Sequence, residues 1–227
     1  MTTTTMTPNA ASPSDRLRAA LAHDASSARL QAALAAGTAP DAAYVEALIA
    51  RCAVEPDFFV RDMLTWALLR HPAEATVTRL LDEARSQTAQ ARSQALHTLS
   101  KIGDPRGWAA ISAGALADPD DVVAATAWRA AVRLVPSGGE SALAADLAEH
   151  FGRGDRDLQL SLSRALVDLG EPADAAIDAG AVHADPRIRA HAIATRRLRE
   201  DPDTAFDAAI ADAKRFVALA NAPTPRD

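Results

Sequence analysis

The sequence has little cysteine, few aromatic residues and no long apolar run, and these shortages exclude several classes of protein. Its single cysteine excludes a disulfide framework and a cysteine-based zinc ribbon. No apolar stretch approaches the roughly 20 residues that a membrane-spanning helix needs. Residues 1–9 have neither the basic nor the apolar segment of a secretory signal. We therefore expect a cytoplasmic protein without a membrane partner.

Basic residues do not predominate, because 24 Lys and Arg stand against 30 Asp and Glu, and the formal net charge is −6. A protein that binds nucleic acid by neutralising phosphates normally carries the opposite sign. The sequence also has no glycine-rich phosphate loop, no Gly-x-Ser-x-Gly elbow and no His-Glu-x-x-His zinc motif. These absences favour a protein that is not an enzyme, and we expect no cofactor and no metal.

The residues that are abundant predict an all-α fold. Alanine and leucine dominate, whereas the β-branched and aromatic runs typical of strands are nearly absent. Val60, Leu64, Ala67 and Leu68 follow the spacing of one buried helix face. Acidic residues followed by proline recur along the chain, as at Asp104-Pro105. We interpret these pairs as helix caps rather than catalytic carboxylates, because a carboxylate accepts the free N–H groups of a first turn.

An internal repeat organises the chain. Segments that begin at residues 28, 60, 91, 123, 158 and 188 each start with an aliphatic residue, often followed by arginine, with another aliphatic residue four positions later. The starts are 30 to 35 residues apart, a period typical of solenoids built from helix pairs. The partner helices are predicted near 42–54, 74–86, 106–117, 140–151 and 172–181. A closing helix at about 204–220 contains Phe206, Ile210, Phe216 and Leu219.

These segments resemble HEAT repeats, in the short form named after phycobilisome lyases. The resemblance rests on the aliphatic-arginine opening of the segments and on the ending Leu99–Arg106. It covers about residues 26–200. Two segments depart from it, because Ala124 and Gln159 occupy positions where arginine is expected. Residues 55–66 are also similar to a segment of HEAT proteins from GC-rich bacteria. The resemblance implies an all-α, right-handed α-solenoid with the function of a scaffold or adaptor. We expect one domain at 14–221 between disordered tails at 1–13 and 222–227.

A candidate binding face follows from helix geometry. With Val60 and its equivalents pointing inward, the side chains two, five, six and nine positions later point outward, toward the concave side of a solenoid. These columns hold tryptophan, arginine and aliphatic residues instead of a solvated charged face, a composition typical of protein-binding surfaces. The alternative is that helix packing buries them. The predicted partner-binding residues are Trp66, Leu69, Leu96, His97, Trp128, Arg129, Val132, Arg164 and Ile193.

A second column contains Arg61, Arg92 and Arg189. The family resemblance implies that these arginines form a hydrogen-bonded ladder between repeats, and a clamp on a carboxylate or phosphate is the alternative. Neighbouring acidic residues such as Asp57 and Asp185 are candidate partners for them.

The sequence thus predicts a monomeric adaptor, not an enzyme, that binds a protein or peptide on its concave face. The alternative is an alkylpurine DNA glycosylase or another DNA-binding protein. One family of these glycosylases is built from HEAT-like repeats in a chain of similar length. Such enzymes place aromatic residues, an aspartate and an arginine around the damaged nucleotide. Residues of the same types are present here, namely Asp62, Trp66, Trp128, Arg129 and Arg164. They do not match a glycosylase motif residue by residue. The acidic net charge disfavours DNA.

Overall fold

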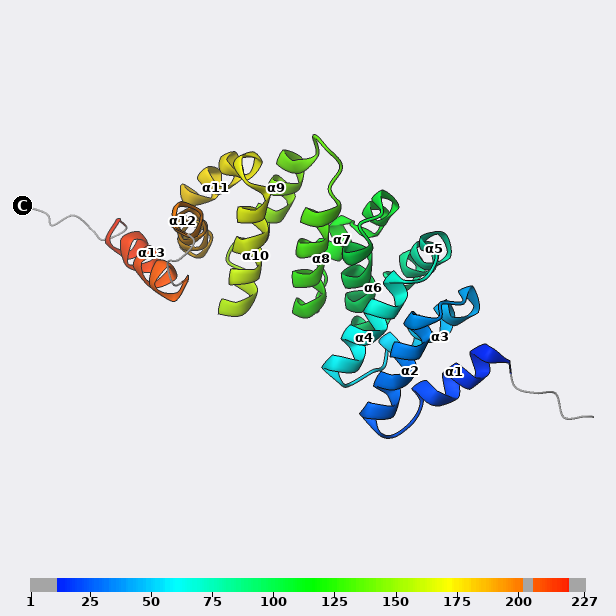
Figure 1. Ribbon diagram of the computed structural model, residues 1–227. Coiled ribbons are helices and arrows are strands. Elements are labelled where there is room, and N and C mark those ends of the chain that lie inside the picture. The colour runs from blue at the N-terminus through cyan, green and yellow to red at the C-terminus, as the bar shows by residue number, and fades with distance from the viewer. Residues whose placement is uncertain (1–11, 202–205, 221–227) are drawn as a thin grey trace, which may run out of the picture. The chain divides into compact units, whose positions relative to one another are not determined.

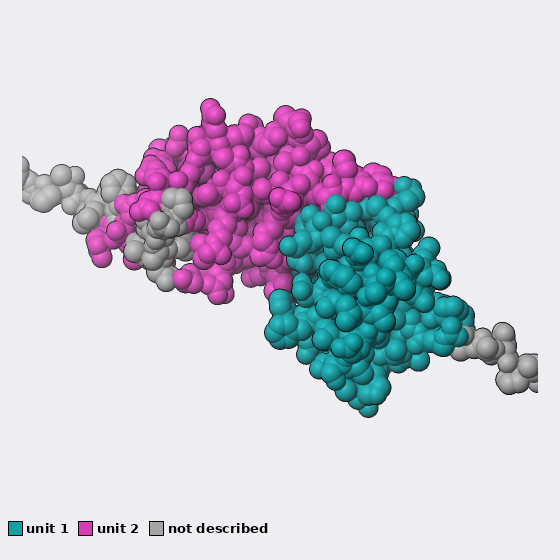
Figure 2. Space-filling model, in the orientation of Figure 1, with its two compact units in different colours: residues 1–102 teal, residues 103–227 magenta. Residues whose placement is uncertain are grey.

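The computed structural model describes residues 12–201 and 206–220, and within these ranges every regular element is a helix (Figure 1). The all-α class is therefore confirmed. The predicted tails lie outside the described residues, apart from Ser12, which caps the first helix, and Pro13, which begins it. The chain divides into two compact units, residues 1–102 and 103–227, coloured teal and magenta in Figure 2. Each unit is described by itself.

The first unit alternates the helices of the repeat with their partners. The helices that carry the repeat marks are α2, α4 and α6, and α4 packs against both of the others. Leu48, Leu64, Leu68 and Leu99 are among the fully buried side chains of its core. The elements of this unit are α1 (Pro13–Leu21), α2 (Ser26–Thr38), η1 (Ala42–Tyr44), α3 (Val45–Cys52), α4 (Phe58–Leu69), α5 (Ala73–Glu83) and α6 (Ala89–Ile102).

The second unit continues the same alternation. Helix α10 packs against α8 and α12, and α13 packs against α12, where Ile210 lies against the buried Ala190 and Val217. The predicted closing helix is thus present, whereas the side chains of Phe206, Phe216 and Leu219 lie outside the described residues. The elements are η2 (Pro105–Ala110), α7 (Ala113–Leu116), α8 (Asp121–Leu134), α9 (Glu140–Ala148), α10 (Arg156–Leu169), η3 (Glu171–Ala173), α11 (Asp174–Ala181), α12 (Pro186–Glu200) and α13 (Phe206–Ala220).

Aspartates cap four of the repeat helices, α4, α8, α10 and α12. Asp185, which caps α12, belongs to a predicted acidic-proline pair, whereas Ala25 before α2 makes no side-chain cap. Asp57 accepts hydrogen bonds from the backbone N–H groups of Phe59 and Val60, at 2.9 and 3.1 Å. Asp120 and Asp155 cap α8 and α10 in the same way. The N–H of the capping residue is itself bonded in several repeats, because it donates to a side chain two residues earlier. Asp57, for example, donates its N–H to the Glu55 carboxylate. The first turns are therefore fixed by side chains within a few residues of each helix start.

The arginines of the predicted ladder have a different, local role. The Nη1 atom of Arg61 donates to the carbonyl oxygens of Glu55 and Pro56, in the loop directly before its own helix. The Nη1 atoms of Arg92 and Arg189 bond the two equivalent carbonyls of their loops. These bonds close the loop at the start of each of these repeat helices. An arginine five and six residues after these two carbonyls reaches them because its side chain, in the first helical turn, points back toward the helix N-terminus.

The same loop geometry recurs where the sequence departs from the repeat. Ala124 has no guanidinium, and Arg153 from the next loop donates instead to the carbonyl oxygen of Asp118, at 2.5 Å. Gln159 donates its side-chain amide to the carbonyl of Gly154 at 3.2 Å. Both repeats that lack the arginine of the pattern, at Ala124 and Gln159, thus have another side chain that donates a hydrogen bond to a loop carbonyl.

Candidate functional site

Of the three predicted side chains five positions after the inward residue, Leu96 and Trp128 are buried, so the prediction is wrong for these two, whereas Ile193 is half-buried. Leu96 is 1% exposed and Trp128 is 0% exposed. The Trp128 indole donates its Nε1–H to the carbonyl oxygen of Leu116 at 3.0 Å and lies 5.7 Å from the His150 ring, measured between ring centroids. Trp128 is therefore part of the core of the second unit and is not available to a partner.

Helix geometry alone does not separate the buried column from the exposed one. At roughly 100° per residue, the side chain five positions on lies about 140° from the inward direction, and the side chain six positions on lies about 120° away on the opposite side. Neighbouring elements cover the first of these. In the second unit, for example, Ser163 of α10 hydrogen-bonds Thr195 of α12 at 2.7 Å.

Trp66 and Leu69 lie on the surface of α4, as predicted. They are 39% and 42% exposed. The Trp66 ring rests on α2 at Gly37, where an added Cβ would lie 2.3 Å from the ring. The guanidinium carbon of Arg70 lies 5.9 Å from the centre of the same ring, within cation–π range. Glycine at residue 37 thus leaves room for the Trp66 ring against α2, while the tryptophan remains partly exposed to solvent.

Two further aromatic residues on α4 extend this surface. Phe58 and Phe59 are 66% and 72% exposed, and their rings meet edge to face with centroids 5.6 Å apart. These two phenylalanines are not among the predicted partner-binding residues, although adjacent phenylalanines directly after a helix cap are a visible signal in the sequence. We call the exposed face of α4 and its neighbour on α2 the α4 surface, and it consists of Leu34, Phe58, Phe59, Asp62, Trp66, Leu69 and Arg70.

Most of the strongly exposed large apolar side chains belong to the first unit. Only Val122 and Val182 of the second unit, among the described residues, join the group. His97 is half-buried on α6, also in the first unit. An apolar surface with tryptophan and phenylalanine that no described element covers is typical of a protein-binding site.

Arg129 and Arg164 share one site in the second unit. They line a cavity of about 310 Å³ between α8 and α10, together with Asp157 and Asp168. Arg129 donates to the Thr126 hydroxyl at 3.1 Å, and burial lowers the pKa of its guanidinium. Arg164 makes no hydrogen bond or ion pair with another described residue. The structure thus brings the two predicted arginines together, whereas Val132 and Ile193 are half-buried.

A buried ion cluster in the first unit has an unusual pKa but a structural role. Glu55 is 0% exposed and receives two hydrogen bonds from Arg29, at 2.7 and 2.8 Å, and one from Arg51 at 2.7 Å. Burial opposes its ionisation, yet these bonds outweigh burial and hold the pKa of its carboxyl at about 2. The Asp57 backbone N–H donates to the same carboxylate at 2.9 Å, so the cluster ties the loop before α4 to α2 and α3.

Cys52 and His191 are likewise enclosed. Burial raises the pKa of the Cys52 thiol to about 12, as expected for an inert cysteine. His191 is 1% exposed. Its Nδ1 accepts the Gly152 N–H at 3.0 Å, which leaves the proton on Nε2, facing the Gln159 carbonyl at 3.0 Å. Burial lowers the pKa of His191 to about 4, so the ring is neutral near pH 7.

The neutral His191 predicts a loss of stability in mild acid. Its pKa is about 4 in the folded protein and about 6.5 in the unfolded chain, so between these values only the unfolded chain gains the proton. The free energy of unfolding should fall as the pH drops from 7 to 5, by about 2 kcal/mol from this group. Urea unfolding at both pH values measures the loss, and NMR titration of the ring identifies its source. A His191 ring that titrates near pH 6.5 in the folded protein would contradict the prediction.

The described residues contain no group of three or more His, Cys, Asp or Glu side chains that could hold a metal ion. Within the same residues, no helix combines the length and the apolar character needed to cross a membrane. In comparisons with known proteins, no family model and no curated protein matches the sequence. The resemblance to HEAT repeats therefore stays a prediction.

Proposed function

We propose that this protein is a cytoplasmic scaffold, not an enzyme, that binds a protein or peptide partner, and that its repeats form a right-handed HEAT-like α-solenoid. The exposed α4 surface is the observation that carries this proposal. Recurrence of one loop geometry before successive repeat helices supports the repeat architecture, because each repeat begins in the same way. No observation specifically favours the DNA glycosylase alternative, since Trp128, one of the residues that suggested it, is buried.

The spacing of the α4 surface fits a helical segment of the partner. Phe59, Asp62, Trp66 and Leu69 follow one another at intervals of three or four residues along α4, which is the spacing of a helix–helix contact. The apolar members would be buried in the contact. Asp62 and Arg70 lie beside them and would pair with charges of opposite sign on the partner.

Replacement of Trp66 by alanine should weaken partner binding while the protein stays folded. A tryptophan anchor in an interface contributes about 2 kcal/mol or more, which corresponds to roughly a 30-fold loss of affinity. We would isolate partners from cells of the source organism with the full chain and then measure the affinity of a purified partner by calorimetry. The far-UV circular dichroism of the variant should match that of the parent.

Two exposed positions give a matched control. Phe59 is 72% exposed and Val182 is 81% exposed, so an aspartate at either position should leave folding intact. Phe59→Asp should reduce partner binding, whereas Val182→Asp, in the second unit, should not. If every partner is retained by both Trp66→Ala and Phe59→Asp, the α4 surface is not the binding site.

A further inference from the structure

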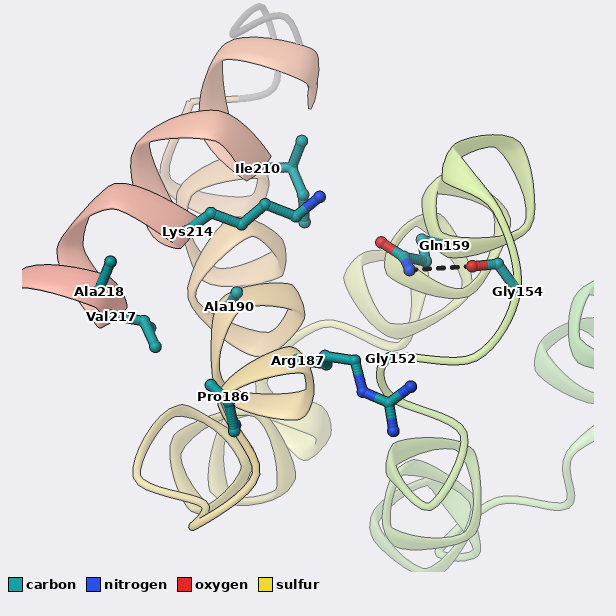
Figure 3. A pocket seen from close by; sticks show the side chains of 10 residues that line it. All are labelled: Gly152, Gly154, Gln159, Pro186, Arg187, Ala190, Ile210, Lys214, Val217 and Ala218. Carbon is teal, nitrogen blue, oxygen red and sulfur yellow. Dashed lines mark hydrogen bonds between the residues drawn. The ribbon is translucent and has the colours of Figure 1, made fainter. Parts of the chain in front are cut away.

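A second cavity lies in the second unit, between the start of α10 and the helices α12 and α13. Its volume is about 440 Å³, within the range of small-molecule sites. Figure 3 shows Pro186 and Ala190 of α12 and Ile210 and Lys214 of α13 on one side of it. Gln159 of α10 lies across from Lys214.

The cavity stays open because small residues line it. Gly152 and Gly154, in the loop before α10, have positive φ angles of 80° and 68° and contribute only backbone. Ala190 and Ala218 contribute single methyl groups. Ile210 and Val217 also belong to the apolar cluster between α12 and α13. The cavity wall formed by α12 and α13 is therefore apolar, whereas the wall formed by the loop before α10 consists of polar backbone groups.

The charged groups at this cavity are both cationic. Lys214 extends from α13 toward the side on which Gln159 lies (Figure 3), and it makes no hydrogen bond or ion pair with another described residue. Arg187 carries the second positive charge. Its side chain is 80% exposed, and its guanidinium lies 3.4 Å from the Asp185 carboxylate. None of the residues that line this cavity is acidic, in contrast to the cavity at Arg129, which has two aspartates.

We propose that this cavity binds a small amphipathic carboxylate, a molecule with an apolar chain and one anionic end. The chain would lie against Ile210, Val217 and Ala190, where it displaces water from apolar surface. The carboxylate would accept a charge-assisted hydrogen bond from the Lys214 ammonium. This site is separate from the α4 surface, and either proposal stands if the other fails.

The chain offers a selective reporter for this site, because it contains only two lysines, Lys101 and Lys214. We would label lysine with ¹³C in the full chain and titrate it with sodium octanoate, with 1-octanol and octylamine as matched ligands. The Lys214 resonances should shift with saturation at one octanoate per chain, while those of Lys101, in the first unit, should not. 1-Octanol should bind more weakly than octanoate, and octylamine most weakly.

Two variants separate the charge from the apolar space. Lys214→Gln should weaken octanoate binding about tenfold, since it removes one charge-assisted hydrogen bond, and Lys101→Gln should leave binding unchanged. Ala218→Phe should reduce the binding of both octanoate and 1-octanol, because Ala218 is exposed and its replacement fills the cavity without entering the core. The absence of a saturable Lys214 shift, equal affinities for octanoate and octylamine, or unchanged octanoate affinity in both Lys214→Gln and Ala218→Phe would overturn the proposal.

Discussion

Replacement of Glu55 by glutamine is expected to lower the free energy of unfolding by about 3 to 5 kcal/mol, the usual result of breaking a buried ion pair. The carboxylate is fully buried and joins α2, through Arg29, to Arg51 at the end of α3. Glutamine has the same shape, but it leaves the Arg29 guanidinium, itself only 6% exposed, without a counter-charge. Urea unfolding followed by circular dichroism measures the loss.

An exposed ion pair of the same unit provides the control. Arg18 and Asp15 are 3.0 Å apart, and both side chains are more than half exposed. Asp15→Asn should therefore change the free energy of unfolding by less than about 1 kcal/mol. The double variant Arg29→Met/Glu55→Leu removes the unpaired charge as well and should recover part of the loss. If Glu55→Gln is no more harmful than Asp15→Asn, the buried cluster does not stabilise the first unit.

Replacement of Trp128 by alanine should also cost about 3 to 5 kcal/mol, because the largest fully buried side chain among the described residues is then exchanged for a methyl group. The variant leaves a cavity beside His150 and removes the donor to the Leu116 carbonyl. That carbonyl loses its indole partner, which adds to the cost. The measurement is again urea unfolding, with the transition expected at a lower denaturant concentration.

Trp66→Ala is the matched comparison for Trp128→Ala, since the two residues occupy neighbouring helical positions in the sequence pattern. Trp66 is 39% exposed, so its removal should cost less stability than that of Trp128. Partner binding should show the opposite order at temperatures where both variants are folded. A Trp128→Ala variant that keeps its stability but loses its partner would contradict the assignment of Trp128 to the core.

The sequence predicted correctly the features that arise within a few residues. The cap at Asp104 and the all-α class depend on contacts inside one helix or its first turn. The arginine of the repeat was recognised, but its role was not. Arg61 was expected to join repeats, and it instead bonds carbonyls five and six residues before it. The family resemblance identifies this arginine as part of the repeat. Its position in the first helical turn places its guanidinium next to the carbonyls of the preceding loop.

The candidate site was predicted only in part for a related reason. Trp66 and Trp128 look equivalent in the sequence, because positions five and six of a helix lie at similar angles from its buried face. Trp128 is buried since Leu116 and His150 lie against it, whereas Trp66 lies over Gly37 with one side exposed. Helical periodicity by itself therefore determined which residues form helices and which side chains face inward. Only the packing of elements from other repeats, more than ten residues away, decided which of the remaining side chains stay exposed.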